Sequence, residues 1–414
     1  MNNNSRIKNT MAVSLGSFLE LFEFSLYGIY AQLFSKIFFD EQDSNVSIAY
    51  SLGIFAVGFL ARPIGAFIFG HIGDKYGRVR SLLISIPIMF FSTFSIGLLP
   101  TYQEIGIAAP LLLLVLRILQ GISVGGEYNG ATVYLTELLP DRKELAGAIV
   151  SASGMSGTLC AILLSYYSFQ GLWSWRFPFL CSIFISLVII YLRYRLVEST
   201  YFDYIMQRKR TSTYPIVDVF KKHRRNLFST ILVGGANGIF TFHFIVYLNI
   251  FITTFCGAST EISLFFNAMS ILCFIIFCVF LGMNVRIKQN KPILLVLSLI
   301  MILVSPLLYL LLITQCDNLI LFAEIIFGLL AGGFSGIINS FMCRLFPAHV
   351  KYTGVALGYS LGVAVFGGTV PVICNFLIHS FHSNLLSPCL YLAFGGLMAI
   401  SGIMLGKTCQ DEDF

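Results

Sequence analysis

Twelve apolar runs recur along the 414-residue chain, and each is long enough to cross a lipid bilayer. A helix needs roughly 20 apolar residues to span the hydrocarbon layer. Only 11% of the residues are charged, whereas a soluble domain carries about 25%. The pattern predicts an all-α polytopic membrane protein whose twelve transmembrane helices, here called spans one to twelve, cover residues 11–34, 46–69, 81–100, 108–135, 145–168, 174–193, 227–253, 261–283, 292–313, 319–343, 354–378 and 385–405.

The basic residues predict the orientation. Nearly all of the 26 Lys and Arg fall on one side if both termini are cytoplasmic, as the positive-inside rule requires. The polar start, MNNNSRIKNT, leads into a full-length span without a cleavage site and is interpreted as a retained tail. The net charge of +6 reflects this topology and is compatible with anionic lipid, so no nucleic-acid partner is implied.

The longest polar stretch, residues 194–226, is rich in basic residues and divides the chain into two sets of six spans. We expect an N-terminal bundle over 1–193, a cytoplasmic linker over 194–226 and a C-terminal bundle over 227–414. The ten cysteines are scattered without a CxxC pair, which argues against a disulfide framework or a metal site. No nucleophile–base constellation is present, so neither an enzyme nor a cofactor is expected.

The two halves resemble each other in corresponding spans. The pattern R-x-x-x-G-x-x-x-G-G at 117–126 returns as E-x-x-x-G-x-x-x-G-G at 324–333. In span one, F-E-F-x-x-Y at 22–27 matches F-H-F-x-x-Y at 242–247 in span seven. Such repeats are typical of secondary transporters that bind substrate near the midplane.

Charges invert between the matched positions. Arg117 corresponds to Glu324, and Glu137 corresponds to Arg344. Because repeat-related positions lie at similar depth, an inverted pair could bridge the halves, and a contact made in one state only would bias alternating access. Glycines four residues apart predict close helix packing at Gly121 and Gly125, at Gly328 and Gly332, and at Gly354, Gly358 and Gly362.

A loop between spans two and three resembles a family signature. GHIGDKYGRVR at 70–80 is similar to the G-x-x-x-D-[RK]-x-G-R loop of the major facilitator superfamily, with its residues at Gly70, Asp74, Lys75, Gly77 and Arg78. LELFEFSLYG at 19–28 and RILQGISVGGEYNGATVYLTELLPDR at 117–142 resemble its metabolite:proton symporter branch, which includes proline/betaine, α-ketoglutarate, shikimate and citrate carriers. The resemblance implies two six-helix bundles, with spans one, four, seven and ten lining a central cavity.

The chain departs from that branch in places. Glu23 stands where aspartate is usual, and the loop at 282–292 lacks the acid of its first-half counterpart. Span five has no Gly-Pro pair, which is the signature of drug:proton antiporters in the superfamily. These features favour symport over drug export.

Charged residues within spans are candidates for the transport site, because each costs about 2.5–3.5 kcal/mol to insert. Glu20 and Glu23 share a helix face at i, i+3, and neighbouring carboxylates in low dielectric do not easily both ionise. A proton-handling pair and a structural pair that is hydrogen-bonded to neighbours are both open. Arg117 could pair with Glu23 or Glu324, hold a substrate carboxylate, or form a permanent ion pair.

Further candidates follow from the repeat and from the loop. Glu127 in the GGE motif is a second coupling candidate, and the resemblance and the repeat rank His243, Tyr247, Glu324 and Asn339 as cavity residues. A charge network closing the cytoplasmic side is expected from Gly70, Asp74, Lys75, Gly77, Arg78, Arg62, Glu137 and Arg344. Arg62 is expected to support the Asp74 loop rather than to touch substrate.

Together these features predict a multi-pass protein of the bacterial inner membrane, working as a monomer. It would take up a small zwitterionic or carboxylated solute, such as proline, betaine or a dicarboxylate, with a proton as the coupling ion. An exporter or antiporter, and a non-transporting receptor on the same fold, are the alternatives.

Overall fold

The computed structural model describes residues 3–39, 44–207 and 212–409, and within these ranges the regular structure is helical with no strand. The first half contains α1 (Asn3–Ile37), α2 (Ser44–Leu60), α3 (Arg62–Tyr76), α4 (Arg78–Leu98), α5 (Tyr102–Ile105), α6 (Ala108–Leu138), η1 (Pro140–Arg142), α7 (Lys143–Phe169) and α8 (Arg176–Arg193). The linker contains α9 (Thr200–Gln207) and α10 (Pro215–Lys222). The second half contains α11 (Arg224–Phe242), η2 (His243–Tyr247), α12 (Leu248–Phe255), α13 (Thr260–Asn284), η3 (Ile287–Gln289), α14 (Asn290–Ile313), α15 (Asp317–Cys343), η4 (Ala348–Val350), α16 (Lys351–Gly362), η5 (Val363–Gly367), α17 (Val370–Ser380) and α18 (Cys389–Leu405).

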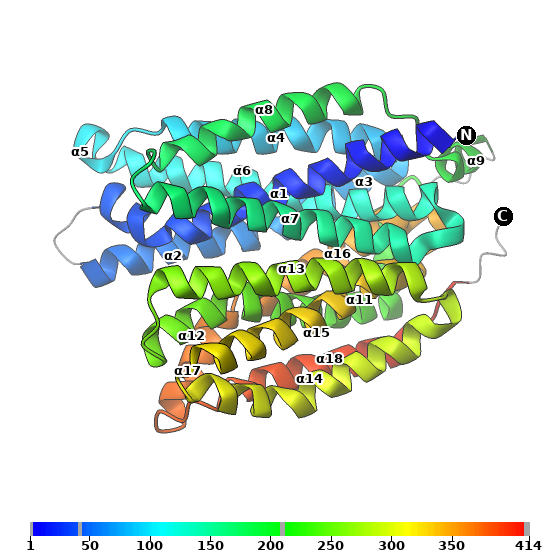
Figure 1. The fold of residues 1–414 in the computed structure, drawn as a ribbon. Helices are drawn as coiled ribbons and strands as arrows, with labels where there is room; N and C mark the ends of the chain where they lie inside the picture. Colours follow the sequence, from blue (N-terminus) through cyan, green and yellow to red (C-terminus); the bar gives the residue numbers. More distant parts are fainter. Residues whose placement is uncertain (1–2, 40–43, 208–211, 410–414) are drawn as a thin grey trace.

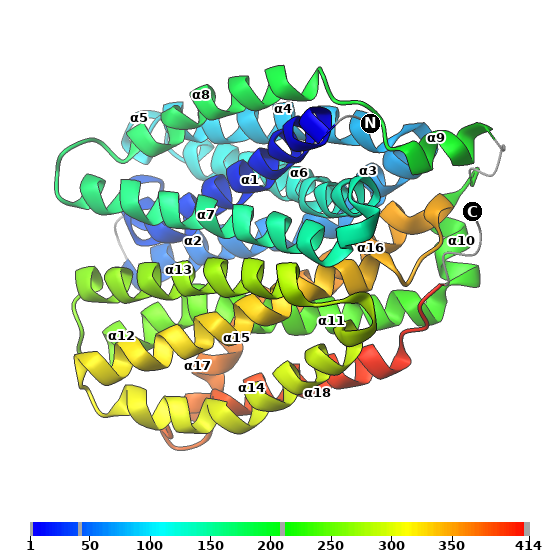
Figure 2. The ribbon, with the colours of Figure 1, turned by 45° about the vertical axis from the view of Figure 1, so that its right-hand side comes forward.

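The helices form two bundles that lie side by side (Figures 1 and 2). Helices α1 to α8 make one bundle, and α11 to α18 make the other. The start of α1 and the end of α18 lie, together with α9 and α10, at one end of the molecule, which we call the linker end. The two bundles pack against each other along α7 with α13, and along α3 with α16.

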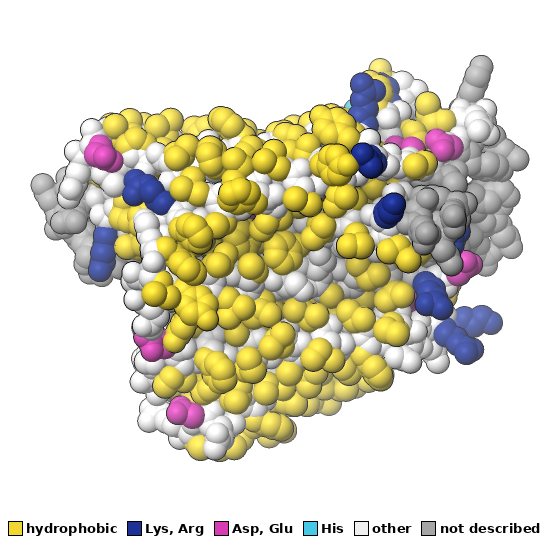
Figure 3. Space-filling view, turned by 45° about the horizontal axis from the view of Figure 1, so that its top comes forward, with side chains coloured by type: hydrophobic (Ala, Val, Ile, Leu, Met, Phe, Trp, Pro, Cys, Tyr) yellow, Lys and Arg dark blue, Asp and Glu magenta, His cyan; other side chains and the backbone are white. Residues whose placement is uncertain are grey.

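The twelve predicted spans are confirmed as helical segments. Eleven helical segments of the described chain are long and apolar enough to cross a membrane, and the last, Cys389–Leu405, is a shorter apolar helix. Its 17 residues match the lower limit for a membrane helix. Apolar side chains cover the middle of the surface in Figure 3, and the Lys and Arg visible on that face lie towards its two ends.

Three of the spans are interrupted, which the apolar pattern does not predict. Span two breaks at Ala61, where Pro63 in the first turn of α3 lacks the N–H of a continuous helix. Spans seven and eleven each contain one π-helical turn, η2 at His243–Tyr247 and η5 at Val363–Gly367. Turns of this kind occur frequently at functional sites, and η2 contains two of the candidate residues.

The repeated glycines lie where helices approach closely, as predicted, and they pack the same pairs of spans in both halves. A Cβ on Gly121 would collide with the Gly58 carbonyl oxygen, so α6 touches the backbone of α2. A Cβ on Gly328 would collide with the Ser270 carbonyl oxygen, so α15 touches the backbone of α13. Spans four and ten therefore approach spans two and eight by the same means.

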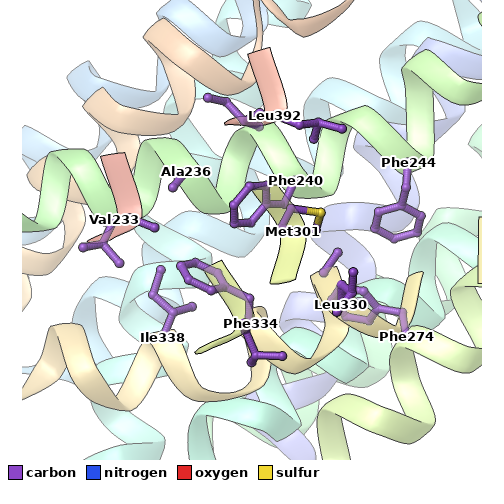
Figure 4. Packing of buried hydrophobic residues seen from close by; sticks show 14 of the residues in the cluster. Val233, Ala236, Phe240, Phe244, Phe274, Met301, Leu330, Phe334, Ile338 and Leu392 are labelled. Carbon is purple, nitrogen blue, oxygen red and sulfur yellow. The ribbon is translucent and has the colours of Figure 1, made fainter. Parts of the chain in front are cut away.

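Apolar side chains fill the second bundle. Phe240 of α11 and Phe334 of α15 meet edge to face, with ring centroids 5.2 Å apart. Figure 4 shows these rings between Met301 of α14 and residues of neighbouring helices. Against this background the buried polar residues of both halves stand out as exceptions that need partners.

Candidate functional site

The intramembrane charges predicted from the sequence are all buried. Each is at most 5% exposed: Glu20, Glu23, Arg62, Arg117, Glu127 and Glu324. Helices α1, α3 and α6 carry the five in the first half, and α15 carries Glu324. Their partners differ, and the differences separate structural ion pairs from groups that are free to change state.

Glu23 is joined to Arg117 through two polar side chains. The Thr93 hydroxyl of α4 donates to Glu23 Oε2 at 2.7 Å and accepts from Gln120 Nε2 at 2.5 Å. The Gln120 Oε1 atom accepts from Arg117 Nη1 at 2.8 Å. The second oxygen of Glu23, Oε1, is buried without a hydrogen-bond partner among the described residues. We call these four residues the Glu23 relay.

The relay modifies the expectation for Arg117. In the described part of the chain Arg117 forms no ion pair with Glu23 or Glu324. Hydrogen bonds through Gln120 and Thr93 link it to Glu23 instead. Sequence reasoning missed both linking residues. Gln120 lies one turn after Arg117 in an otherwise apolar segment, and that spacing was the available signal.

Glu20 faces a different neighbour from Glu23. Among the charged groups around Glu20, Arg62 of α3 has the largest electrostatic effect on it. The Oε2 atom of Glu20 has no hydrogen-bond partner in the described structure. The two acids therefore have different neighbours in this conformation, Arg62 beside Glu20 and Thr93 beside Glu23.

The expectation that Arg62 supports the Asp74 loop is wrong for this conformation. The Arg62 Cζ atom lies 4.3 Å from the centre of the Phe24 ring and 4.5 Å from that of Phe59. Asp74 is twelve residues further along the span, which is roughly 18 Å at 1.5 Å per helical residue. The break at Ala61 starts α3 at Arg62 and leaves this side chain beside α1.

Glu127 forms a buried ion pair that the sequence did not reveal. Both of its carboxylate oxygens accept from the guanidinium of Arg193 at the end of α8, with Nη1 to Oε2 at 2.9 Å. The Ser85 hydroxyl also donates to Oε2, at 2.6 Å. The sequence analysis did not single out Arg193, whose Nη1 also donates to the Leu82 carbonyl at 2.7 Å. These contacts favour a structural role for Glu127 over proton handling.

The second half repeats the contact between its first and third spans. His243 Nε2 lies 2.7 Å from the Tyr309 hydroxyl, joining spans seven and nine as Glu23 and Thr93 join spans one and three. Tyr247 lies on the same π turn with its hydroxyl unpartnered among the described residues. Neither carboxylate oxygen of Glu324 has a hydrogen-bond partner within the described ranges.

Asn339 lies at the interface between the bundles rather than in a cavity of the second half. Its Nδ2 is 3.0 Å from each of three acceptors in the first half, the Tyr128 hydroxyl, the Gly147 carbonyl and the Ser151 hydroxyl. Tyr128 stacks on Tyr359 of α16 with ring centroids 5.3 Å apart. This polar contact holds the bundles together in the present conformation.

The Asp74 loop closes the linker end. Asp74 Oδ1 accepts from Arg78 Nη1 at 2.8 Å, and Arg78 Nη2 lies 3.4 Å from Glu137 Oε1. The same Asp74 carboxylate accepts the backbone N–H groups of Tyr352 and Thr353, at 3.1 and 2.8 Å. Asp74 therefore caps the N-terminus of α16 in the other bundle, where an anion is stabilised by the helix dipole.

Two glycines permit this closure. A Cβ on Gly70 would lie 2.9 Å from the Thr353 Cα atom, so α3 and α16 meet there without a side chain between them. Gly77 has a φ of 115°, a conformation that other residues rarely adopt. Both glycines are thus required by the backbone, as the loop signature implies.

Besides Arg62, two more residues expected in this network lie outside it. Arg344 pairs with Glu144, with Nη2 to Oε1 at 3.7 Å, and bonds the Ile287 carbonyl. Lys75 Nζ lies 5.3 Å from the centre of the Tyr76 ring. The repeat partner of Glu137 is therefore not its contact, and Lys351 Nζ is found instead 3.6 Å from Glu137 Oε1.

Known proteins resemble the chain along nearly its whole length. A model of the Major Facilitator Superfamily matches residues 13–370. The proline/betaine transporter of Escherichia coli (strain K12) is 30% identical over 428 residues, which cover 98% of this chain and 83% of that protein. The inner membrane metabolite transport protein YhjE of the same organism is 30% identical over 431 residues, covering 98% and 95%.

Solved structures agree with the fold. The structure of the proton:xylose symporter XylE bound to 6-bromo-6-deoxy-D-glucose superposes with a TM-score of 0.75 at 17% identity, covering 98% of this chain and 95% of that one. At this identity the likeness supports the two-bundle architecture alone. The family match and the full-length relatives carry the assignment further: the chain belongs to the Major Facilitator Superfamily, in the branch that includes the proline/betaine transporters.

Proposed function

We propose that the protein is a proton-coupled symporter that takes up a small zwitterionic or carboxylated organic solute, such as proline, betaine or a dicarboxylate. The Glu23 relay is the observation that carries this proposal. The buried Glu23 carboxyl has one oxygen without a hydrogen-bond partner among the described residues. Its other oxygen is linked to the Arg117 guanidinium through hydrogen bonds of Thr93 and Gln120. The names of the full-length relatives support solutes of this class.

In this mechanism Glu23 changes its protonation state during the cycle. When Glu23 is ionised, the Thr93 hydroxyl donates to it and the relay orients Arg117 towards Gln120. When Oε1 takes up a proton, the carboxyl loses its charge, and Arg117 becomes available to an anionic group of the solute. Proton binding and solute binding then favour each other at one site.

Access alternates as the two bundles rock against each other. The Asp74 cap on α16 closes the linker end. Because of the distribution of basic residues, we assign this end to the cytoplasmic side of a bacterial inner membrane. Opening requires Asp74 to leave Tyr352 and Thr353. Each proton moving inward at 100 mV supplies about 2.3 kcal/mol to the cycle.

The proposal is tested by uptake of labelled proline, betaine and succinate into proteoliposomes, with and without an imposed pH gradient. We expect at least one solute to accumulate only with the gradient. No accumulation under any gradient contradicts the symporter and leaves the non-transporting receptor. If an outward gradient of the solute drives protons into the proteoliposomes in exchange for the solute, the antiporter is supported instead.

Glu23→Gln tests the coupling residue. The amide cannot bind and release the proton, so pH-driven accumulation should be abolished while counterflow exchange of solute survives at least in part. Lys36→Gln, at an exposed position on the same helix, is the matched control. Normal pH-driven uptake by Glu23→Gln rules out this role for Glu23.

A further inference from the structure

The three interruptions of the spans meet at one side chain, Phe59 of α2. Phe59 lies two residues before the break at Ala61. Its ring meets that of Phe242, the residue before the π turn η2, edge to face with centroids 4.9 Å apart. A Cβ on Gly368, the residue after the π turn η5, would lie 3.0 Å from Phe59 Cγ. Because Phe242 and Gly368 belong to the second bundle, this is a contact between the bundles.

Glycines join spans seven and eleven on the linker side of these turns. A Cβ on Gly362 would collide with the Ile231 carbonyl oxygen, so α16 touches the backbone of α11. Gly238 of α11 and Gly367 of η5 face each other, because a Cβ on either one would lie 3.1 or 3.0 Å from the Cα atom of the other. A π turn interrupts the hydrogen-bond ladder of a helix and allows it to bend. The two spans are thus fixed to each other up to the level at which both can bend.

Phe59 lies on the outer side of a buried charge. Helix α2 begins at the end opposite the linker end, here called the outer end, and leads into α3 (Figure 1). Phe59 is therefore about one turn further out than Arg62, and the Arg62 Cζ atom lies 4.5 Å from the centre of its ring. Arg62 is in turn the charged group with the largest effect on Glu20. One aromatic ring thus touches both this charge and the bends of the second bundle.

The outer ends of the bundles are also in contact. Gln170 Nε2, just after α7, donates to Glu261 Oε1 of α13 at 3.0 Å. The Asp74 cap closes the linker end at the same time. A solute that enters from outside needs the outer end to open, and the ring of Phe59 then has to leave Phe242.

We propose that Phe59 is the outer gate residue and that its ring transmits the state of the Arg62 charge to the bends in spans seven and eleven. The ring is held by a cation–π contact with Arg62 and by an edge-to-face contact with Phe242. A proton or solute that binds beside Arg62 changes the first contact, and loss of the second lets α12 and α17 bend away at η2 and η5. This inference rests on the alternating access of the proposed function and adds the residue that couples the charged site to the outer end.

The first test measures the outer end with spin labels. The labels are attached at Gln170→Cys and Glu261→Cys after replacement of the ten native cysteines, and double electron–electron resonance gives their separation. Loss of one aromatic pair should raise the ratio of long to short separations about 2- to 10-fold in Phe59→Leu. Phe242→Leu should have the same effect, and the double variant should add little to it. Phe67→Leu, at an exposed position of α3, is the matched control and should leave the ratio unchanged.

Labelling of Cys343 separates a gate from a general loss of packing. This cysteine ends α15 near the linker end and is 3% exposed. In a variant that keeps Cys343 as its only cysteine, Phe59→Leu should not speed maleimide labelling, because only the outer end opens. Faster labelling of Cys343 would show that the ring merely stabilises packing and would overturn the gate. An unchanged ratio of spin-label separations in Phe59→Leu would also overturn it.

The link to Arg62 is tested in the same spin-labelled protein. Arg62→Gln removes the cation from the ring and should raise the ratio of long to short separations, whereas Arg62→Lys, which keeps a cation, should raise it less. In the Phe59→Leu background Arg62→Gln should have little further effect, because the ring that transmits the charge is gone. Fully additive effects of the two substitutions would contradict transmission through Phe59.

The gate and the proposed function fail separately, since the spin-label measurement needs no transport. If the separations respond as expected while no solute accumulates in the uptake assay, the gate stands and the symporter is wrong. If a solute accumulates with the pH gradient while Phe59→Leu changes neither the separations nor the uptake, the symporter stands and the gate is wrong.

Discussion

At the scale of single residues, the buried carboxylates of this protein fall into two groups, those with a partner for both oxygens and those with an unpartnered oxygen. Glu127 has both oxygens bound by Arg193, whereas Glu23 keeps one oxygen free and reaches Arg117 through Thr93 and Gln120. A completed buried pair resists change, because breaking it leaves an uncompensated charge. An incomplete pair can change its protonation or its partner during a cycle.

The Thr93 hydroxyl should be required for coupling. Thr93→Val keeps the branched shape but removes the hydrogen bond to Glu23, and such a bond to a charged group is worth about 1.5–3 kcal/mol. We expect pH-driven uptake to fall about 10- to 100-fold in Thr93→Val and to stay near normal in Thr93→Ser. Ser92→Ala is the matched control, since that hydroxyl donates to Ile88 within its own helix. Equal uptake in Thr93→Val and the control would argue against the relay.

At the scale of elements, the start of the linker supports the N-terminus of α4. Glu198 Oε2 accepts the Val79 backbone N–H at 3.1 Å. It occupies the space where a Cβ of Gly77 would lie. The Ser199 hydroxyl donates to Glu137 Oε2 at 2.6 Å. The linker is therefore joined to the Asp74 loop and is more than a connection between bundles.

Glu198 should make stability depend on pH. Burial is the largest effect on this carboxyl and raises its pKa above the ordinary value of 4.5. The folded protein therefore binds the proton more tightly than the unfolded chain, and the free energy of unfolding falls as pH rises from 4.5 through the raised pKa. We expect the unfolding temperature of the wild type, relative to Glu198→Gln, to be highest below pH 4.5 and to decrease above it.

Glu104 offers a control of opposite sign. Hydrogen bonds from Thr101 lower the pKa of this carboxyl, so the wild type should gain stability relative to Glu104→Gln as pH rises. The raised pKa of Glu198 would be contradicted if the unfolding temperature of the wild type minus that of Glu198→Gln stayed constant, or increased, as the pH rises.

At the scale of the whole molecule, the Asp74 cap ties one bundle to the other. Its carboxylate binds Arg78 in its own bundle and two backbone N–H groups of α16 in the other. Since removal of one partner of a buried pair costs about 3–5 kcal/mol, Asp74→Asn should open the linker end more often. Cys343, which is 3% exposed, can report this opening.

The measurement is maleimide labelling of a variant whose only cysteine is Cys343. Asp74→Asn should label faster than its parent, and Asp317→Asn, at an exposed position on α15, should not. Equal labelling rates in all three proteins would show that the cap does not hold this end closed.

The amino-acid sequence was enough to predict the number and order of the spans, the duplicated halves, close packing at the repeated glycines and the loop that closes one end. These follow from hydrophobicity and local spacing, which act along the chain. It did not predict the interruptions at Ala61, η2 and η5, because a local break in an apolar run leaves the composition of the run unchanged.

The partner of each buried charge, in contrast, follows from the packing of the folded chain. Arg62 was assigned to the Asp74 loop, and Arg193, Thr93 and Gln120 were not singled out. The physical reason is helix rotation. A turn of 100° per residue sends neighbouring side chains to different helices, and the choice among them depends on packing between segments far apart in the chain.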